Sequence, residues 1–163
     1  MVRIEKNEFT KVVSDCNCRS QLEHENSVSP EFWKYTIDSQ EFLKKNGVYS
    51  IWRTNEDRTA FVSDFRASAF PITFNELAKN QDLFPKFDFQ PTSNYFGNQD
   101  IIVYHCKSCG IRVVKDGNHR LLQCVLENIN PNITAYEAAS SNWLTSNVDM
   151  KNFCRCFSAN TAG

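Results

Sequence analysis

The chain has 163 residues, about the length of one compact domain. Hydrophobic residues make up 41% and charged residues 23%, a composition typical of soluble globular proteins, and no apolar run is long enough to span a bilayer, so we expect no membrane partner. Because 18 Lys and Arg residues nearly balance 19 Asp and Glu residues, the net charge of -1 disfavours a basic nucleic-acid-binding protein, although it leaves room for a local basic patch.

The N-terminal region, residues 1–30, gives few structural signals. Its first eight residues contain no apolar stretch of signal-peptide length, so we expect a cytoplasmic protein. Residues 5–25 mix charge, Asn and Cys, and they predict only a short helix or strand followed by a polar connection. We therefore expect a single domain over residues 1–163, with an N-terminal extension and a loose tail at residues 158–163.

Clear helix and strand signals begin near residue 38. Asp38 or Ser39 can cap a helix that has an acidic first turn, a basic last turn and a glycine, Gly47, just past its end. Residues 48–52 are aromatic and β-branched and predict a strand, and residues 61–65 predict another.

A shorter helix and an aromatic loop are expected next. Thr73 can cap a helix in which Phe74, Leu77 and Ala78 have helical spacing. Residues 83–97 are rich in Phe and interrupted by proline, a pattern that favours an ordered loop held by aromatic anchors.

The second half of the chain predicts a hairpin, a helix and a strand. Residues 101–106 and 111–115 are strand-like and joined by a short turn containing glycine. Residues 118–128 have an apolar stripe at helical spacing, with Asn118 as the expected N-cap, and residues 133–138 are strand-like again. The expected fold class is α/β (α+β), with a small mixed sheet built around this hairpin-helix-strand unit.

Seven cysteines raise the question of a metal site. They fall as two Cys-x-Cys pairs, one Cys-x-x-Cys pair and a single residue in a helical pattern, at positions 16, 18, 106, 109, 124, 154 and 156. The odd number prevents complete pairing within the chain, and the pairs lie far apart in the sequence. We expect mostly reduced thiols and no bound metal.

The strongest local motif runs from residue 113 to residue 122, where a strand enters an Asp-Gly turn and passes directly into a helix. The free N–H groups and positive dipole end of such a helix favour an anion. Gly117 permits close approach, while His119 and Arg120 add a titratable group and a guanidinium suited to phosphate. Asp116 can hold a divalent cation or accept a proton, so we take Asp116 and His119 as candidate catalytic residues. A structural turn capped by Asn118 explains the same spacing equally well.

The run Asp116-Gly117-Asn118-His119-Arg120-Leu121 resembles the Asp-Gly-x-His-Arg-Leu signature of the ParB/sulfiredoxin-like superfamily. The resemblance covers roughly residues 101–138 and implies a ParB/sulfiredoxin-like fold. It also implies that Gly117, Asn118, His119 and Arg120 bind the phosphates of a nucleotide, with ATP and Mg²⁺ as the expected cofactors and Asp116 at the reacting end.

Two departures from the superfamily narrow this expectation. Sulfiredoxins carry their catalytic cysteine where this chain has Asn118, and the Gly-Glu-Arg-Arg motif of partition proteins is absent from the sequence. We therefore expect a phosphotransferase or phosphohydrolase that is neither a sulfiredoxin nor a partition protein. Its second acidic residue is left open among Asp38, Glu41, Asp64 and Glu76.

Two other functions remain open. The chain can be a ParB-like nuclease or toxin module that acts on nucleic acid or nucleotide and is partnered by a cognate immunity protein. It can also be a non-catalytic immunity or adaptor protein. His105 is interpreted as a half-buried strand histidine, and the three tryptophans are interpreted as packing residues. Asp116 and Arg120 are both expected at an exposed turn.

Overall fold

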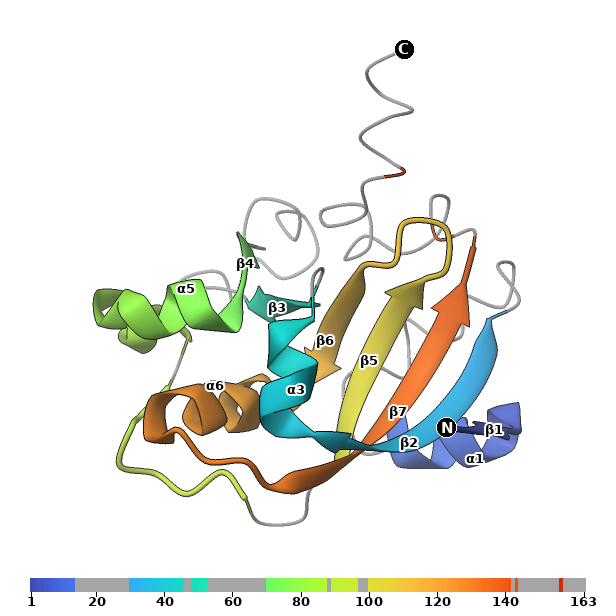
Figure 1. Cartoon of the computed structure of the whole chain (residues 1–163), viewed down its shortest axis with the longest axis horizontal. Coiled ribbons are helices and arrows are strands. Elements are labelled where there is room, and N and C mark those ends of the chain that lie inside the picture. The colour runs from blue at the N-terminus through green and yellow to red at the C-terminus, as the bar shows by residue number, and fades with distance from the viewer. Residues whose placement is uncertain are drawn as a thin grey trace.

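The computed structural model describes residues 1–13, 30–45, 48–52, 70–87, 89–96, 100–141, 143 and 156. They form one mixed α/β domain around a seven-stranded sheet in the order β1-β2-β7-β5-β6-β3-β4 (Figure 1). The strands are β1 (Val2–Ile4), β2 (Glu31–Asp38), β3 (Val48–Trp52), β4 (Phe70–Ile72), β5 (Asp100–Cys106), β6 (Arg112–Asp116) and β7 (Asn132–Ser140). The helices are α1 (Lys6–Val13), α3 (Ser39–Lys44), α5 (Phe74–Lys79), the 3-10 helix η3 (Gln81–Phe87) and α6 (Asn118–Glu127).

The predicted hairpin-helix-strand unit forms the centre of the sheet. β5 pairs antiparallel with β6, and α6 then leads the chain to β7, which pairs parallel with β5 on its other side. β7 also pairs antiparallel with β2 over the whole length of β2. Since neighbouring strands and packed layers cover β7 on every side, six consecutive residues at its end are buried.

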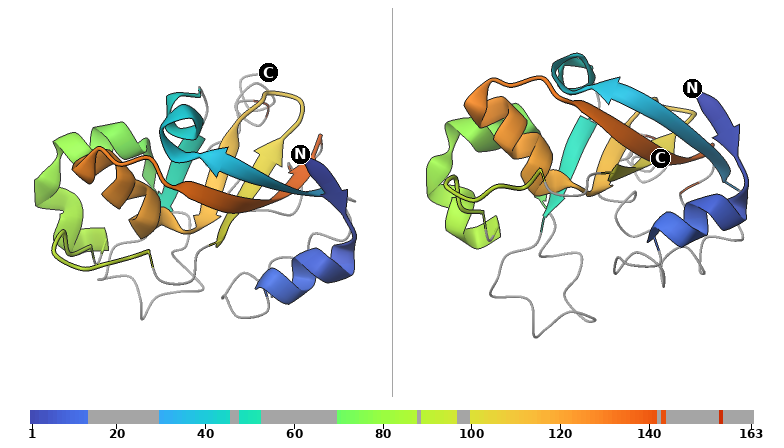
Figure 2. Two further views of the ribbon diagram at one scale, coloured as in Figure 1. Left: turned by 60° about the horizontal axis from the view of Figure 1, so that its bottom comes forward. Right: turned by 90° about the horizontal axis from the view of Figure 1, so that it is seen from below.

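The two faces of the sheet carry separate cores. On one face, alternate residues of β5 such as Ile101 and Val103 pack with residues of α3, α5 and α6. On the other face, Ile102 and Tyr104 pack with Phe9 of α1 and with Trp143. Figure 2 shows α1 on the opposite side of the sheet from α3.

Both short helices begin with the predicted caps. The Asp38 carboxylate accepts a hydrogen bond from the Glu41 N–H at 3.0 Å, which satisfies a first-turn donor of α3. Thr73 and Glu76 form a reciprocal capping box at α5. These two helix predictions are confirmed, while Gly47 lies outside the described residues.

The remaining predictions have mixed outcomes. The strand at 48–52 is confirmed as β3, whereas the strand expected at 61–65 and the tail at 158–163 lie outside the described residues. The sequence patterns predict no strand where β2 lies. The aromatic anchors of the 83–97 region are confirmed at Phe84 and Phe89, which are buried and in edge-to-face contact.

The first residues of the chain belong to this domain. β1 pairs antiparallel with β2, and the buried ring of Phe9 lies 4.7 Å from the ring of Phe32. In the part of the chain that is described, the helices are too short or too polar to cross a bilayer.

Candidate functional site

The predicted strand, turn and helix around Asp116 are present. β6 ends at the exposed residue Asp116, and α6 begins at Asn118, as expected. Gly117 joins them with φ 95° and ψ 16°, in the left-handed region that glycine adopts without strain. The prediction that Asn118 is the N-cap is wrong, because Gly117 takes that position and Asn118 is the buried first residue of the helix. Because the N-cap residue is a glycine, it makes no side-chain capping hydrogen bond to α6.

Gly117 is also required by the packing of the turn against β5. A Cβ atom at this position would overlap Cγ2 of Ile101 and lie 3.2 Å from Nη1 of Arg120. Ile101 is completely buried. The glycine therefore lets the start of α6 lie directly against the central strand of the sheet.

Arg120 differs from the expectation of an exposed turn residue. Its side chain is half-buried, with Nε donating to the Tyr95 carbonyl at 3.1 Å and Nη1 donating to the Asp100 carbonyl at 2.9 Å. Burial lowers the pKa of Arg120, and the nearby carboxylates of Asp116 and Asp100 act in the opposite direction. An arginine keeps its proton in proteins, so a positive charge remains beside the turn.

An aromatic group forms one side of the turn. The His119 ring stacks on the Tyr95 ring with centroids 4.9 Å apart and lies 5.8 Å from the Phe89 ring. The buried Gln123 amide holds this loop, since its oxygen accepts from the Tyr95 N–H and its nitrogen donates to the Ser93 carbonyl. His119 is thus half-buried against a loop that two residues of α6 hold in place.

The acidic residues proposed from the sequence lie elsewhere. Asp38 caps α3 and also accepts a hydrogen bond from Asn130 at 2.7 Å, while Glu76 belongs to the α5 capping box. Asp64 lies outside the described residues. Asp100 was missed by the sequence analysis, yet its charge and that of Asp116 both act on Arg120. These two exposed carboxylates flank the turn.

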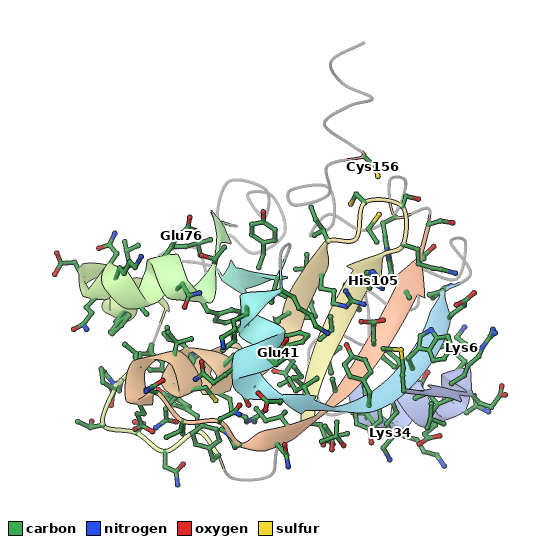
Figure 3. The ribbon with its side chains drawn as sticks, viewed as in Figure 1. Lys6, Lys34, Glu41, Glu76, His105 and Cys156 are labelled. Carbon is green, nitrogen blue, oxygen red and sulfur yellow. The ribbon has the colours of Figure 1, made fainter. Side chains whose placement is uncertain are left out.

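A second polar cluster, also missed from the sequence, lies on the face of the sheet that α3 covers. The carboxylate of Glu137, 2% exposed, accepts hydrogen bonds from the Tyr35 hydroxyl at 2.8 Å and from Arg112 Nε at 2.9 Å. His105 Nδ1 lies 3.3 Å from its other oxygen. The four side chains come from four neighbouring strands, β2, β7, β5 and β6. The interpretation of His105 as a half-buried strand histidine is confirmed (Figure 3).

The contacts within this cluster shift the pKa values of Glu137 and Tyr35. Burial alone would raise the pKa of Glu137, but the hydrogen bond from His105 and the charge of Arg112 outweigh it and hold the pKa below its ordinary value. Burial and the neighbouring Glu137 carboxylate raise the pKa of Tyr35, so its hydroxyl keeps the proton that it donates.

A pocket of about 240 Å³ opens beside the cluster. Tyr35 and Arg112 line it from the sheet, and Asp38, Glu41 and Lys45 line it from the two ends of α3. The pocket therefore presents both signs of charge and a phenol, and Asp38 and Glu41 are the two proposed acids that line it. Arg112 and Asp116 stand at opposite ends of β6, so this pocket and the Asp116–Arg120 turn are separate places.

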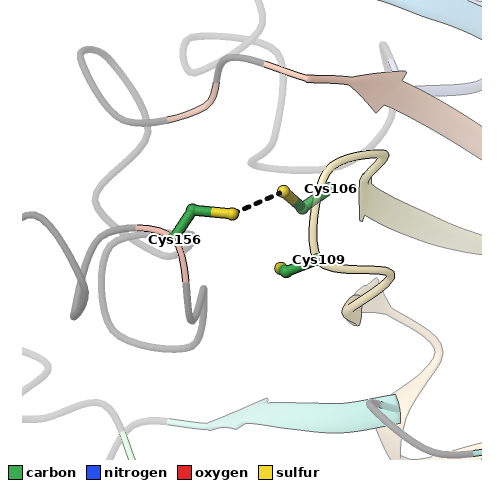
Figure 4. A group of neighbouring side chains, drawn as sticks. All are labelled: Cys106, Cys109 and Cys156. Carbon is green, nitrogen blue, oxygen red and sulfur yellow. Dashed lines mark hydrogen bonds between the residues drawn. The ribbon is translucent and has the colours of Figure 1, made fainter.

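Three cysteines that are distant in the sequence lie together at the tip of the β5-β6 hairpin. The thiols of Cys106, Cys109 and Cys156 are all within 4.8 Å of one another (Figure 4). Cys124 lies apart from them, buried in α6 as its helical pattern indicates. The other three cysteines lie outside the described residues.

The sequence matches no protein-family model, and comparisons with curated proteins and with solved structures give no match. The function must therefore be inferred from the chemistry of these residues.

Proposed function

We propose that this protein is a nucleotide-binding enzyme with a ParB/sulfiredoxin-like fold that transfers or hydrolyses a phosphoryl group at the Asp116–Arg120 turn. The observation that carries the proposal is the left-handed Gly117 at the start of α6, where the N-cap residue makes no side-chain hydrogen bond. This helix start lies between the exposed carboxylate of Asp116 and the half-buried guanidinium of Arg120.

The backbone of the turn supplies the anion-binding groups. The first N–H groups of a helix have no acceptor within the helix, and the helix dipole places partial positive charge at the same end. At α6 no side-chain oxygen takes the capping position, and Arg120 adds a full positive charge one turn from Gly117. Phosphate oxygens match these donors in charge.

The side chains around the turn have distinct roles in the proposal. Asp116 is exposed and accepts the proton of an attacking hydroxyl group or water. His119, held by stacking on Tyr95, is the second titratable group and orients a phosphate oxygen or the leaving group. Arg120 acts through its charge and by fixing the loop and β5 through two carbonyls.

The residues at the turn fit a magnesium ion. Mg²⁺ prefers oxygen ligands and is commonly held by one or two carboxylates together with substrate phosphates. Asp116 and Asp100 are exposed carboxylates on two paired strands, and they would hold the ion. When bound, Mg²⁺ would neutralise the charge of the phosphates.

Binding is tested by thermal unfolding and calorimetry with ATP and the other nucleoside triphosphates, each with Mg²⁺ or with EDTA. At a nucleotide concentration a hundred times Kd, the melting temperature should rise by roughly 5–10 °C. Asp116→Asn should leave nucleotide binding in EDTA largely unchanged and reduce turnover with Mg²⁺ by about a hundredfold or more, because an amide can neither accept the proton nor neutralise the ion as a carboxylate does. Asp82→Asn, on the exposed surface of η3, is the matched control and should change neither.

The outcomes separate the candidate functions. Absence of stabilisation by every nucleotide at millimolar concentration would contradict the proposal. Cleavage of an RNA or DNA oligonucleotide, lost in Asp116→Asn, would instead support a nuclease or toxin module. A protein with neither activity would leave the non-catalytic immunity or adaptor function.

A further inference from the structure

We propose that Cys106, Cys109 and Cys156 bind one Zn²⁺ ion, which fixes the C-terminal part of the chain to the tip of the β5-β6 hairpin. This replaces the expectation that no metal is bound, which was based on the odd number of cysteines and on the distances between their pairs in the sequence. The inference is independent of the nucleotide site, because the Cys cluster lies at the end of the hairpin remote from Asp116.

The hairpin turn holds two of the thiols in a fixed geometry. Cys106 ends β5, and its N–H donates to the Ile111 carbonyl at 2.9 Å, while the Gly110 N–H donates back to the Cys106 carbonyl at 2.8 Å. Gly110 has φ 78°, so the chain turns sharply just after Cys109. A Cys-x-x-Cys pair in such a turn is a typical half of a zinc site with thiolate ligands.

Cys156 contributes the third thiol from a distant part of the sequence. Its sulfur lies 4.0 Å from the Cys106 sulfur, and all three sulfurs are within 4.8 Å of one another. Four ligands at a Zn–S distance of about 2.3 Å in a tetrahedron place sulfur atoms about 3.8 Å apart. A disulfide would require about 2.05 Å and would join only two of the three. The observed spacing is therefore close to that of a metal site.

The surroundings suit a structural ion. Cys106 is 1% exposed, and Cys109 and Cys156 are partly buried against the apolar core that includes Trp143. Thiolates in such a shell are largely shielded from solvent, as they are in structural zinc sites. Lys107, inside the Cys-x-x-Cys turn, is directed to Glu31 at 3.1 Å.

Adjacent His105 is not a ligand of this site. Successive side chains of a strand point to opposite faces of the sheet, so His105 and Cys106 point in opposite directions. The Nδ1 of His105 lies beside Glu137 on the other face of the sheet. The fourth position of the tetrahedron is then taken by a further thiolate or by water. Substitution with Co²⁺ distinguishes these sets, because the intensity of the thiolate-to-cobalt charge-transfer absorption rises with the number of thiolate ligands.

The direct test is elemental analysis of the full chain purified with reductant and reconstituted with Zn²⁺. We expect one zinc per chain, and Cys106→Ser, Cys109→Ser and Cys156→Ser should each reduce zinc content at least severalfold. Cys124→Ser is the matched control, because this thiol lies in α6 outside the cluster, and it should retain one zinc.

A second test uses the unmodified chain, so it does not depend on whether the cysteine variants fold. Co²⁺ added to the metal-free protein should produce thiolate-to-cobalt absorption that stoichiometric Zn²⁺ abolishes, and EDTA should lower the melting temperature of the zinc form. The proposal is overturned if the reconstituted chain holds less than a tenth of an equivalent of zinc, or if the purified chain carries a Cys106–Cys156 disulfide and takes up no metal after reduction.

Discussion

Arg112 forms an ion pair with Glu137 across an intervening strand. Arg112 lies on β6 and Glu137 on β7, with β5 between them, and Arg112 Nε donates to the carboxylate at 2.9 Å. His105 of β5 stands in register with Arg112 and contacts the other carboxylate oxygen. The pair therefore links three central strands through side chains as well as through backbone hydrogen bonds.

Removing the cation from this pair should be strongly destabilising. Arg112→Met leaves the carboxylate of Glu137, which is 2% exposed, without its positive partner, and we expect a loss of about 3 kcal/mol in the free energy of unfolding. Lys34→Met breaks an exposed pair with Glu8 and should cost at most about 1 kcal/mol. Urea unfolding of both variants measures the difference. Equal losses would show that Glu137 does not need the guanidinium.

The same carboxylate should contribute to acid sensitivity. The pKa of Glu137 is held below its ordinary value of 4.5, so its deprotonated form stabilises the folded protein above that pH. This contribution is lost as the pH falls through the lowered pKa. The stability difference between the parent and Glu137→Gln should therefore be largest near neutral pH and shrink below pH 4.5. Urea unfolding between neutral and acidic pH tests this, and a pH-independent difference would contradict it.

The two glycines with positive φ should respond differently to alanine. Gly110→Ala meets no atom within 4 Å and should cost about 1–2 kcal/mol from backbone strain alone. Gly117→Ala has the same kind of strain and also overlaps Ile101, so its loss should be clearly larger. Both are compared by urea unfolding with the metal content held the same. A smaller loss at Gly117 would mean that the turn moves away from β5 easily.

Arg120 should stabilise the loop beside the turn. Arg120→Ala removes two hydrogen bonds from a charged group to the Tyr95 and Asp100 carbonyls, so amide exchange at Tyr95 should accelerate by roughly ten- to a hundredfold. Exchange at Val103, in the central strand, should change much less. Arg3→Ala, on the exposed edge strand β1, is the control and should leave Tyr95 unaffected. Unchanged protection at Tyr95 in Arg120→Ala would contradict this prediction and would indicate that the Gln123 amide holds the loop without help from Arg120.

The parts of the fold that were predictable depend on signals within a few residues. Asp38 and Thr73 cap helices through N–H groups three positions ahead, and Gly117 turns the chain where Asp-Gly separates a strand from a helix. Such interactions do not depend on the rest of the chain. The prediction that Asn118 is the cap was wrong because the same sequence, Gly117-Asn118, is compatible with two helix starts: one capped by Asn118, and one that begins at a left-handed Gly117 without a side-chain cap.

The polar cluster depends on strand order, and the thiol cluster depends on a contact between the β5-β6 hairpin and Cys156, neither of which the sequence patterns predict. Tyr35 and Glu137 are 102 positions apart and meet only because β2 pairs with β7. Cys106 and Cys156 are 50 positions apart, and their contact likewise could not be predicted from local sequence signals. His105 was correctly interpreted as half-buried, but its partner was not identifiable from its own strand.

The central three strands of the sheet come from one continuous stretch, residues 100–140, whereas the pairing of Phe32 with Ala138 closes a long loop. Contacts between residues close in sequence form at a lower entropic cost than contacts that close long loops. We therefore expect β5, β6 and β7 to associate early in folding, around α6, and to provide the edge on which β2 is later added. Both the turn at Gly117 and the cysteine pair of the hairpin would then be shaped before the N-terminal strands join the sheet.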